Sequence, residues 1–210
     1  DRIVGGGFLF YPRWGAGIAA HGDAVVGGKD LSYDVLVANG EQQEANPFEE
    51  DENTSKSITA RLRVDATENL RVGYSFYHDR LSSASYTTLQ SHGFEAELSL
   101  TRFRLLAEVA FGSLGRVSGG EQRQIGWYIQ PSYHLKGGFT PYMRFDYVNP
   151  DRSLSDVDGR DFILGLNVEL SKNFQLKLEN NAFHGGSKST LGSLPGQGYH
   201  EFKAALVLGF

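Results

Sequence analysis

The chain has no cysteine, one methionine and no long apolar run. Without cysteine, neither a disulfide framework nor a thiolate metal site can form. A membrane-spanning helix would require about 18 consecutive apolar residues, and no segment approaches that length. The 20 Lys and Arg residues are outnumbered by 25 Asp and Glu. The basic excess that marks a nucleic-acid-binding protein is therefore missing, and we expect no nucleic-acid partner.

Two further absences concern export and catalysis. The chain does not open with a basic segment followed by an apolar one, so we expect any export signal to have been removed already. The six histidines lack the spacing of metal ligands, and no glycine-rich phosphate-binding loop precedes a helix. We therefore expect no metal, no cofactor and no enzymatic activity.

What the chain does have is a high content of glycine and aromatic residues, with 26 Gly and 12% Phe, Trp and Tyr. This composition is typical of a β protein rich in turns. From residue 55 onward, apolar and polar residues alternate with the period of a strand. Four hairpins follow from this alternation, with short turns at residues 67–69, 101–102, 136–138 and 171–173.

Longer polar stretches separate these hairpins, at residues 80–91, 115–122, 149–159 and 184–198, after an acidic stretch at 41–54. Short turns on one side and long loops on the other are typical of a transmembrane β-barrel. A soluble sandwich with Greek-key connections would not alternate so regularly. We predict an all-β, antiparallel, up-and-down transmembrane β-barrel of about 12 strands. It forms one domain over residues 1–210, and its first strand lies within residues 2–11.

In such a barrel the apolar stripe of each strand faces lipid and the intervening polar residues face a water-filled lumen. Charges of both signs occupy those polar positions. The predicted pore-lining residues are Arg61, Arg63, Arg71, Glu95, Glu97, Arg104, Glu108, Arg144, Asp146, Glu169, Lys177, Glu179 and Lys203.

Two interpretations of this charged lumen remain open. Fixed arginines beside a narrow water column would raise the local concentration of anions and draw them through. Alternatively, arginines and glutamates on neighbouring strands, such as Arg104 and Glu97, form structural cross-strand pairs. The second use is the commoner one in proteins.

Aromatic residues gather within about two positions of the short turns, where an interfacial girdle of a barrel would lie. The predicted girdle consists of Phe103, Tyr133, Phe139, Phe174 and Phe210. The last strand remains apolar up to Phe210, the final residue of the sequence. A terminal aromatic of this kind resembles the signal that barrels present to the barrel-assembly machinery, so we expect Phe210 to contact it.

Residues 15–40, 55–80 and 128–151 resemble hairpins of the phosphate-selective porin O/P family. The first contains a glycine-rich strand, a short turn and the string LSYDVLVANG. The resemblance implies a passive channel, often a homotrimer, in the outer membrane of a Gram-negative bacterium. Members are longer, with about sixteen strands, so this chain would be a carboxy-terminal portion or a shorter relative. No lysine cluster matches the family's phosphate-binding positions.

These observations favour an outer-membrane porin for passive diffusion of small hydrophilic solutes or ions, anions among them. The lipid bilayer and these solutes are its expected partners. One alternative is a barrel with a plugged lumen that acts as a structural or secretion port. Another is an outer-leaflet hydrolase using His78 or His92 with Ser82 or Ser83. A soluble β-sandwich or ligand-binding barrel is the third.

Overall fold

The computed structural model describes residues 10–11, 16–40, 55–81, 85–192, 194 and 196–208, in which every regular element is a strand. The strands are β1 (Gly17–Val26), β2 (Lys29–Ala38), β3 (Ser57–Thr67), β4 (Leu70–Arg80), β5 (Tyr86–Ser99), β6 (Phe103–Arg116), β7 (Glu121–Tyr133), β8 (Phe139–Asn149), β9 (Gly159–Ser171), β10 (Phe174–Gly185) and β11 (Gly198–Leu208). No helix in this part of the chain is long and apolar enough to cross a membrane.

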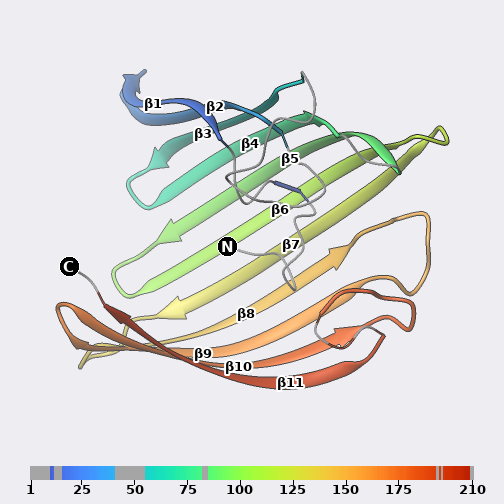
Figure 1. Ribbon diagram of the computed structural model, residues 1–210. Coiled ribbons are helices and arrows are strands. Elements are labelled where there is room, and N and C mark those ends of the chain that lie inside the picture. Colours follow the sequence, from blue (N-terminus) through green and yellow to red (C-terminus); the bar gives the residue numbers. More distant parts are fainter. Residues whose placement is uncertain are drawn as a thin grey trace.

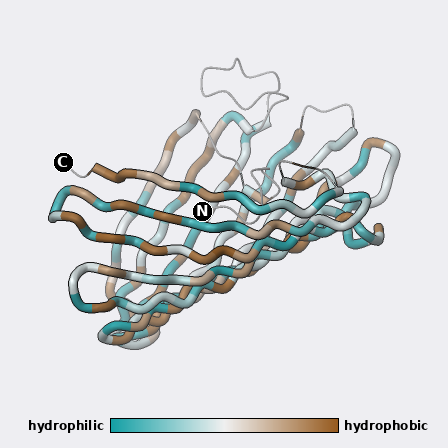
Figure 2. The backbone as a smooth tube through the Cα atoms, turned by 90° about the horizontal axis from the view of Figure 1, so that it is seen from below, coloured by the Kyte–Doolittle hydropathy of each residue, from teal (hydrophilic) through white to brown (hydrophobic). Residues whose placement is uncertain are grey.

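The strands form one antiparallel sheet in which each strand pairs with the next along the chain, in the order β1 to β11. Figure 1 shows this up-and-down arrangement as a continuous band from the β1–β2 hairpin to β11. The sheet is strongly twisted and curled, as the second view in Figure 2 shows. The predicted all-β, up-and-down fold is confirmed, and all four predicted hairpins are present.

Eleven strands are described, where the sequence predicted about twelve. The difference lies in the first predicted strand, residues 2–11. Of these, only Phe10 and Tyr11 belong to the described residues, and both lie outside the strands. The first described strand begins at Gly17.

The tight turns follow from local chemistry. Gly27 and Gly28 connect β1 to β2 with φ values of 58° and 74°. Positive φ at both central residues is the requirement of a type I′ hairpin turn, which glycine meets without steric cost. At the β3–β4 turn, Thr67 Oγ1 accepts hydrogen bonds from the backbone N–H groups of Asn69 and Leu70, at 3.3 and 3.1 Å. Side chains and glycines therefore fix where each hairpin reverses.

The register divides every strand into two faces of opposite character. One, here called the outer face, carries large apolar side chains in the open, such as Phe94, Met143 and Leu164, which are 50–51% exposed. The other, called the inner face, carries buried polar groups, such as Ser91 at 0% and Asp146 at 2% exposure. Hydropathy alternates along each strand accordingly (Figure 2). This distribution inverts that of a soluble protein, in which large apolar side chains are mostly buried and polar ones mostly exposed.

A small apolar cluster lies on the inner face, near the end with the long loops. Ala110 of β6, Val148 of β8 and Phe183 of β10 pack there with Leu191 and with Phe10, and Tyr11 and Tyr199 lie against them. Each of the five core members is at most 8% exposed. The inner face is thus polar along most of its length and apolar at this one level.

Candidate functional site: the charged inner face

All the charged residues predicted from the sequence lie on the inner face of the sheet. Successive side chains of a strand point to opposite sides, so Arg61, Arg63 and Asp65 of β3 share one face. Register pairs carry that face from strand to strand, for example from Arg71 of β4 to Glu97 of β5. The alternation also places Glu108, Asp146, Glu169, Glu179 and Lys203 on it.

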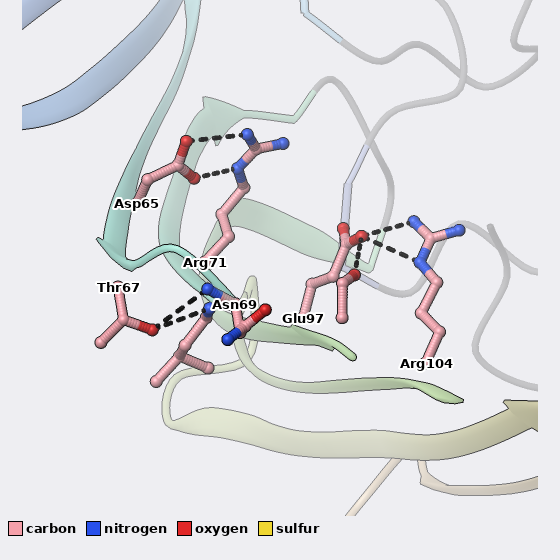
Figure 3. Close-up of polar contacts among 8 residues, drawn as sticks. Asp65, Thr67, Asn69, Arg71, Glu97 and Arg104 are labelled. Carbon is pink, nitrogen blue, oxygen red and sulfur yellow. Dashed lines mark hydrogen bonds and ion pairs between the residues drawn. The ribbon is translucent and has the colours of Figure 1, made fainter. Parts of the chain in front are cut away.

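Two arginine–carboxylate pairs lie near the short turns, and Figure 3 shows both. Arg71 donates to Asp65 through Nε and Nη2, at 2.5 and 3.0 Å, in a two-pronged contact across the β3–β4 hairpin. Arg104 donates to Glu97 across the β5–β6 hairpin, with Nε 2.8 Å from Oε1. Ser99 adds a hydrogen bond to the same carboxylate. Each arginine is therefore neutralised by an acid on the preceding strand.

A third arginine reaches its partner across an intervening strand. Arg61 of β3 forms an ion pair with Glu95 of β5, passing over Gly73 of β4. A Cβ atom at position 73 would collide with the Glu95 side chain. The absence of a side chain at Gly73 thus leaves the space in which the Arg61 and Glu95 side chains meet. Arg63, two residues further along β3, lies 3.9 Å from Asp34 of β2.

A similar arrangement recurs on the inner face at strands β8 to β10, where an aromatic ring lies over a glycine. Tyr142 of β8 lies over Gly165 of β9, and its hydroxyl donates a hydrogen bond to Glu179 of β10. Lys177 Nζ approaches that carboxylate to 2.9 Å. A Cβ at position 165 would fall within the tyrosine ring. The absence of a side chain at Gly165 therefore positions both Tyr142 and Glu179.

An enclosed ion pair lies on β8, beside Tyr142. Arg144 Nε donates to both carboxylate oxygens of Asp146, at 2.8 and 3.0 Å, and the two side chains are only 12% and 3% exposed. The guanidinium lies over the Tyr128 ring, 4.0 Å from its centroid. Glu108 on β6 lies beside the Tyr128 hydroxyl. These contacts join β6, β7 and β8 into one polar network.

Two predicted residues remain. Lys203 pairs with Glu201 on its own strand, 2.9 Å apart, and Glu169 is exposed beside Gly138. Among the described residues, the inner-face ion pairs join positions on one strand or on strands at most two apart. They therefore run along the wall of the sheet, and four of the seven cited pairs, Arg61–Glu95, Arg63–Asp34, Arg71–Asp65 and Arg104–Glu97, are cross-strand pairs.

The loop after β8 carries a further charge pair. Arg116 of β6 donates to Asp151 Oδ2 at 2.7 Å, and the Ser153 hydroxyl and backbone N–H bond to Asp151 Oδ1. Burial by itself raises the pKa of Asp151, which is 4% exposed. The Ser153 hydrogen bonds and the Arg116 charge outweigh burial and leave the pKa below its usual value. The carboxylate thus anchors this loop to β6.

Sequence reasoning missed several inner-face features. Asp79 is fully buried, accepts a 3.0 Å hydrogen bond from Tyr77 and lies against Gly40, whose φ is 55°. Alternation along β4 could have identified Asp79. The apolar cluster and the position of Phe10 depend on contacts between distant segments, for which the sequence contains no signal.

The predicted girdle residues that the structure describes lie on the outer face at the short-turn end. Phe103 pairs with Tyr133 across β6 and β7, and Phe139 and Phe174 open β8 and β10. Tyr133, Phe139 and Phe174 are 44–46% exposed. Phe210 lies outside the described residues.

The described residues contain no catalytic arrangement that would support the hydrolase alternative. His92 lies on the outer face, where Nδ1 is 2.7 Å from the Tyr74 hydroxyl and Nε2 is 3.0 Å from Gln90. Ser82 and Ser83 fall outside the described part of the chain, and His78 lies on the same outer face. Within that part, no group of three or more His, Asp or Glu side chains could hold a metal ion.

No family model matches the sequence, and no curated protein matches it. Among solved structures, the chain is similar to an anion-selective porin from Comamonas acidovorans, with a TM-score of 0.66 and 13% sequence identity. The likeness covers 90% of this chain and 57% of that porin, so the chain spans little more than half of the porin's length. At this identity the comparison concerns the fold alone: the chain has the all-β, up-and-down architecture of a porin-like β-barrel.

Proposed function

We propose that the protein is an outer-membrane channel through which small hydrophilic solutes and ions diffuse passively. The observation that carries this proposal is the inverted distribution of side chains. Large apolar residues are exposed on the outer face, while the charged residues lie on the inner one, where Asp79 and Asp146 are buried. A sheet of this kind is stable where its outer face meets hydrocarbon and its inner face meets water. The porin-like fold supports the same conclusion.

The dimensions of the strands fit a bilayer. A tilted strand needs about 9–11 residues to cross the hydrocarbon core, and the described strands have 10 to 14. On the outer face of β8 and β9, apolar residues extend from Phe139 to Tyr147, beside which Arg160 begins a polar margin. Phe103, Tyr133, Phe139 and Phe174 would then form the aromatic girdle on the periplasmic side. We further propose that Phe210 engages the barrel-assembly machinery.

Selectivity between ions follows from the pairing of the lumen charges. The proposed pore-lining arginines Arg61, Arg71, Arg104 and Arg144 each have a carboxylate within ion-pair distance. Paired charges project little field into a water column, because each dipole falls off faster than a free charge and salt screens it. The channel should therefore discriminate only weakly between anions and cations.

We place the protein among distant relatives of the phosphate-selective porin O/P family. The three segments that resemble that family coincide with the hairpins β1–β2, β3–β4 and β7–β8. The pore-lining charges belong to arginine, aspartate and glutamate for the most part, and Lys177 and Lys203 are both paired with acids. Phosphate therefore has no cluster of free lysines to bind among the described residues, and the passage of small ions of either sign fits the inner face better.

A planar-bilayer recording tests the proposal. Purified protein, folded in detergent and shown to be β-rich by circular dichroism, should produce stepwise current increases in KCl. Liposomes carrying it should swell in isotonic solutions of small sugars. Protein that inserts and remains folded but passes neither ions nor sugars would contradict the proposal and favour a plugged structural barrel.

A further inference from the structure

Phe10 and Tyr11 lie on the inner face although they belong to no strand. The Tyr11 hydroxyl is 2.8 Å from Ser75 Oγ on β4. Its ring end also fills the space beside Gly93 of β5, where a Cβ atom would collide with the hydroxyl. Ser75 and Gly93 are register partners and share the inner face. Tyr11 is therefore seated over the middle of β4 and β5.

Phe10, the preceding residue, occupies a different part of the same face. A Cβ atom on Gly112 of β6 would lie 3.2 Å from the Phe10 ring and 2.8 Å from Gln124 Oε1 of β7. Phe10 also belongs to the apolar cluster with Val148 of β8 and Phe183 of β10. Only 5% of its surface is exposed. An aromatic side chain is thus enclosed in the apolar cluster of a face that is polar along most of its length.

The two residues together reach a wide span of the sheet. Adjacent Cα atoms are only about 3.8 Å apart, yet Tyr11 contacts β4 while Phe10 packs in a cluster that extends to β10. Six inter-strand spacings of about 4.8 Å separate those strands along the sheet. The cluster that contains Phe10 extends across the inner face from β6 to β10. The two side chains therefore lie over the middle of the inner face of the curled sheet and not at its edge.

The position of Phe10 leaves a neighbouring polar side chain with an unsatisfied hydrogen-bond acceptor. Gln124 is 2% exposed, and no described residue offers a hydrogen bond to its Oε1 atom. A buried acceptor without a partner is unfavourable. With Phe10 removed, water could reach this amide. The sheet beneath Phe10 thus carries an amide oxygen that water could hydrogen-bond, although an aromatic ring covers it.

We infer that Phe10 and Tyr11 form a constriction inside the channel, with Phe10 as its apolar stopper and Tyr11 as its anchor. The inference rests on the proposed channel function and specifies what limits it. Apolar constrictions restrict hydrated ions because the narrow apolar section disfavours water. The Phe10 side chain sets the largest hydrophilic solute that passes, and it holds the conductance below that of an open lumen of this size.

The test compares Phe10→Ala with the unaltered protein in bilayers and in liposome swelling. The variant should show a higher single-channel conductance and should admit larger sugars. Phe202→Ala is the matched control, because Phe202 is an equally large aromatic that is 67% exposed on the outer face. Its conductance and size limit should equal those of the unaltered protein.

The outcomes separate this inference from the channel function itself. Equal conductance and equal size limits in Phe10→Ala and the unaltered protein would overturn the constriction and leave the channel. If both proteins are folded and neither conducts, constriction and channel are overturned together. Should Phe10→Ala fail to fold, Phe10→Leu keeps the cluster apolar with a smaller side chain; a higher conductance supports the constriction and an unchanged one overturns it.

Discussion

At the scale of single residues, the glycines of the inner face determine which side chains can meet. Gly165 is the clearest case, because the Tyr142 ring occupies the space where a Cβ would lie. Gly165→Ala should displace Tyr142 and break its hydrogen bond to Glu179. Hydrogen bonds to charged groups contribute about 2 kcal/mol, and we expect a loss of that size in the free energy of unfolding, measured by guanidinium titration in detergent.

A double-mutant cycle provides the control for this prediction. In a Tyr142→Ala background the ring is absent, so Gly165→Ala should cost much less than in the unaltered protein. Equal costs in the two backgrounds would show that Tyr142 and Gly165 are not coupled. Tyr142→Phe separates the hydroxyl from the ring, since it retains the packing over Gly165 and loses only the bond to Glu179.

Asp151 provides a second prediction at this scale, one that depends on pH. Its folded pKa is depressed, so its stabilisation of the loop is complete above the ordinary Asp pKa of about 3.9. The stabilisation is lost as the pH falls through the lower folded value. At neutral pH, Asp151→Asn should weaken the protection of loop amides 151–158 by about 2 kcal/mol, roughly thirtyfold in hydrogen exchange.

Two comparisons check that assignment. Below the folded pKa the variant and the unaltered protein should exchange alike. Asp158→Asn, which removes a pair with the 58%-exposed Arg160, should change protection little at any pH, because exposed pairs contribute at most about 1 kcal/mol. An equal effect of the two substitutions would contradict the special role of Asp151.

At the scale of the strand, we expect the outer face to require apolar side chains and the inner face to accept charged ones. Ile129 and Gln130 are neighbours on β7, the first on the outer face at 41% exposure and the second on the inner face. Ile129→Arg should destabilise the protein in a bilayer by about 2–4 kcal/mol, because it places a charge in hydrocarbon. Gln130→Arg, the matched control, should cost less than about 1 kcal/mol. Reversible unfolding in lipid vesicles measures both; similar costs would contradict the assignment of the outer face to lipid.

The strands themselves could be predicted from the sequence because their two signals are local. Alternation fixes the register, since a slip of one residue would turn every side chain to the wrong face. Glycine and polar residues mark the turns, as at Gly27 and Gly28. The apolar cluster could not be predicted, because Ala110, Val148 and Phe183 interrupt the polar stripe only where segments far apart in the sequence meet. Phe10 lies in a stretch without alternation, and its seat depends on those same distant contacts.

At the scale of the whole molecule, we expect the pairing of charges along the wall to determine the ion selectivity of the proposed channel. Glu97→Gln would leave Arg104 without its carboxylate partner and add one positive charge to the lumen. We expect the reversal potential in a KCl gradient to shift toward that of chloride, with an anion-to-cation permeability ratio raised roughly twofold to tenfold. Arg104→Gln should shift it the opposite way.

The control for charge alone is Glu68→Gln, which changes the net charge by the same amount but lies in the exposed β3–β4 turn. It should leave the anion-to-cation permeability ratio unchanged. Salt concentration adds a physical check. The screening length is about 10 Å at 0.1 M and about 3 Å at 1 M, so a field that acts across the lumen should lose most of its effect at the higher concentration. If Glu97→Gln left the reversal potential unchanged even at 0.1 M, Arg104 would not face the permeating ions. The inner-face pairs would then serve only to hold neighbouring strands together.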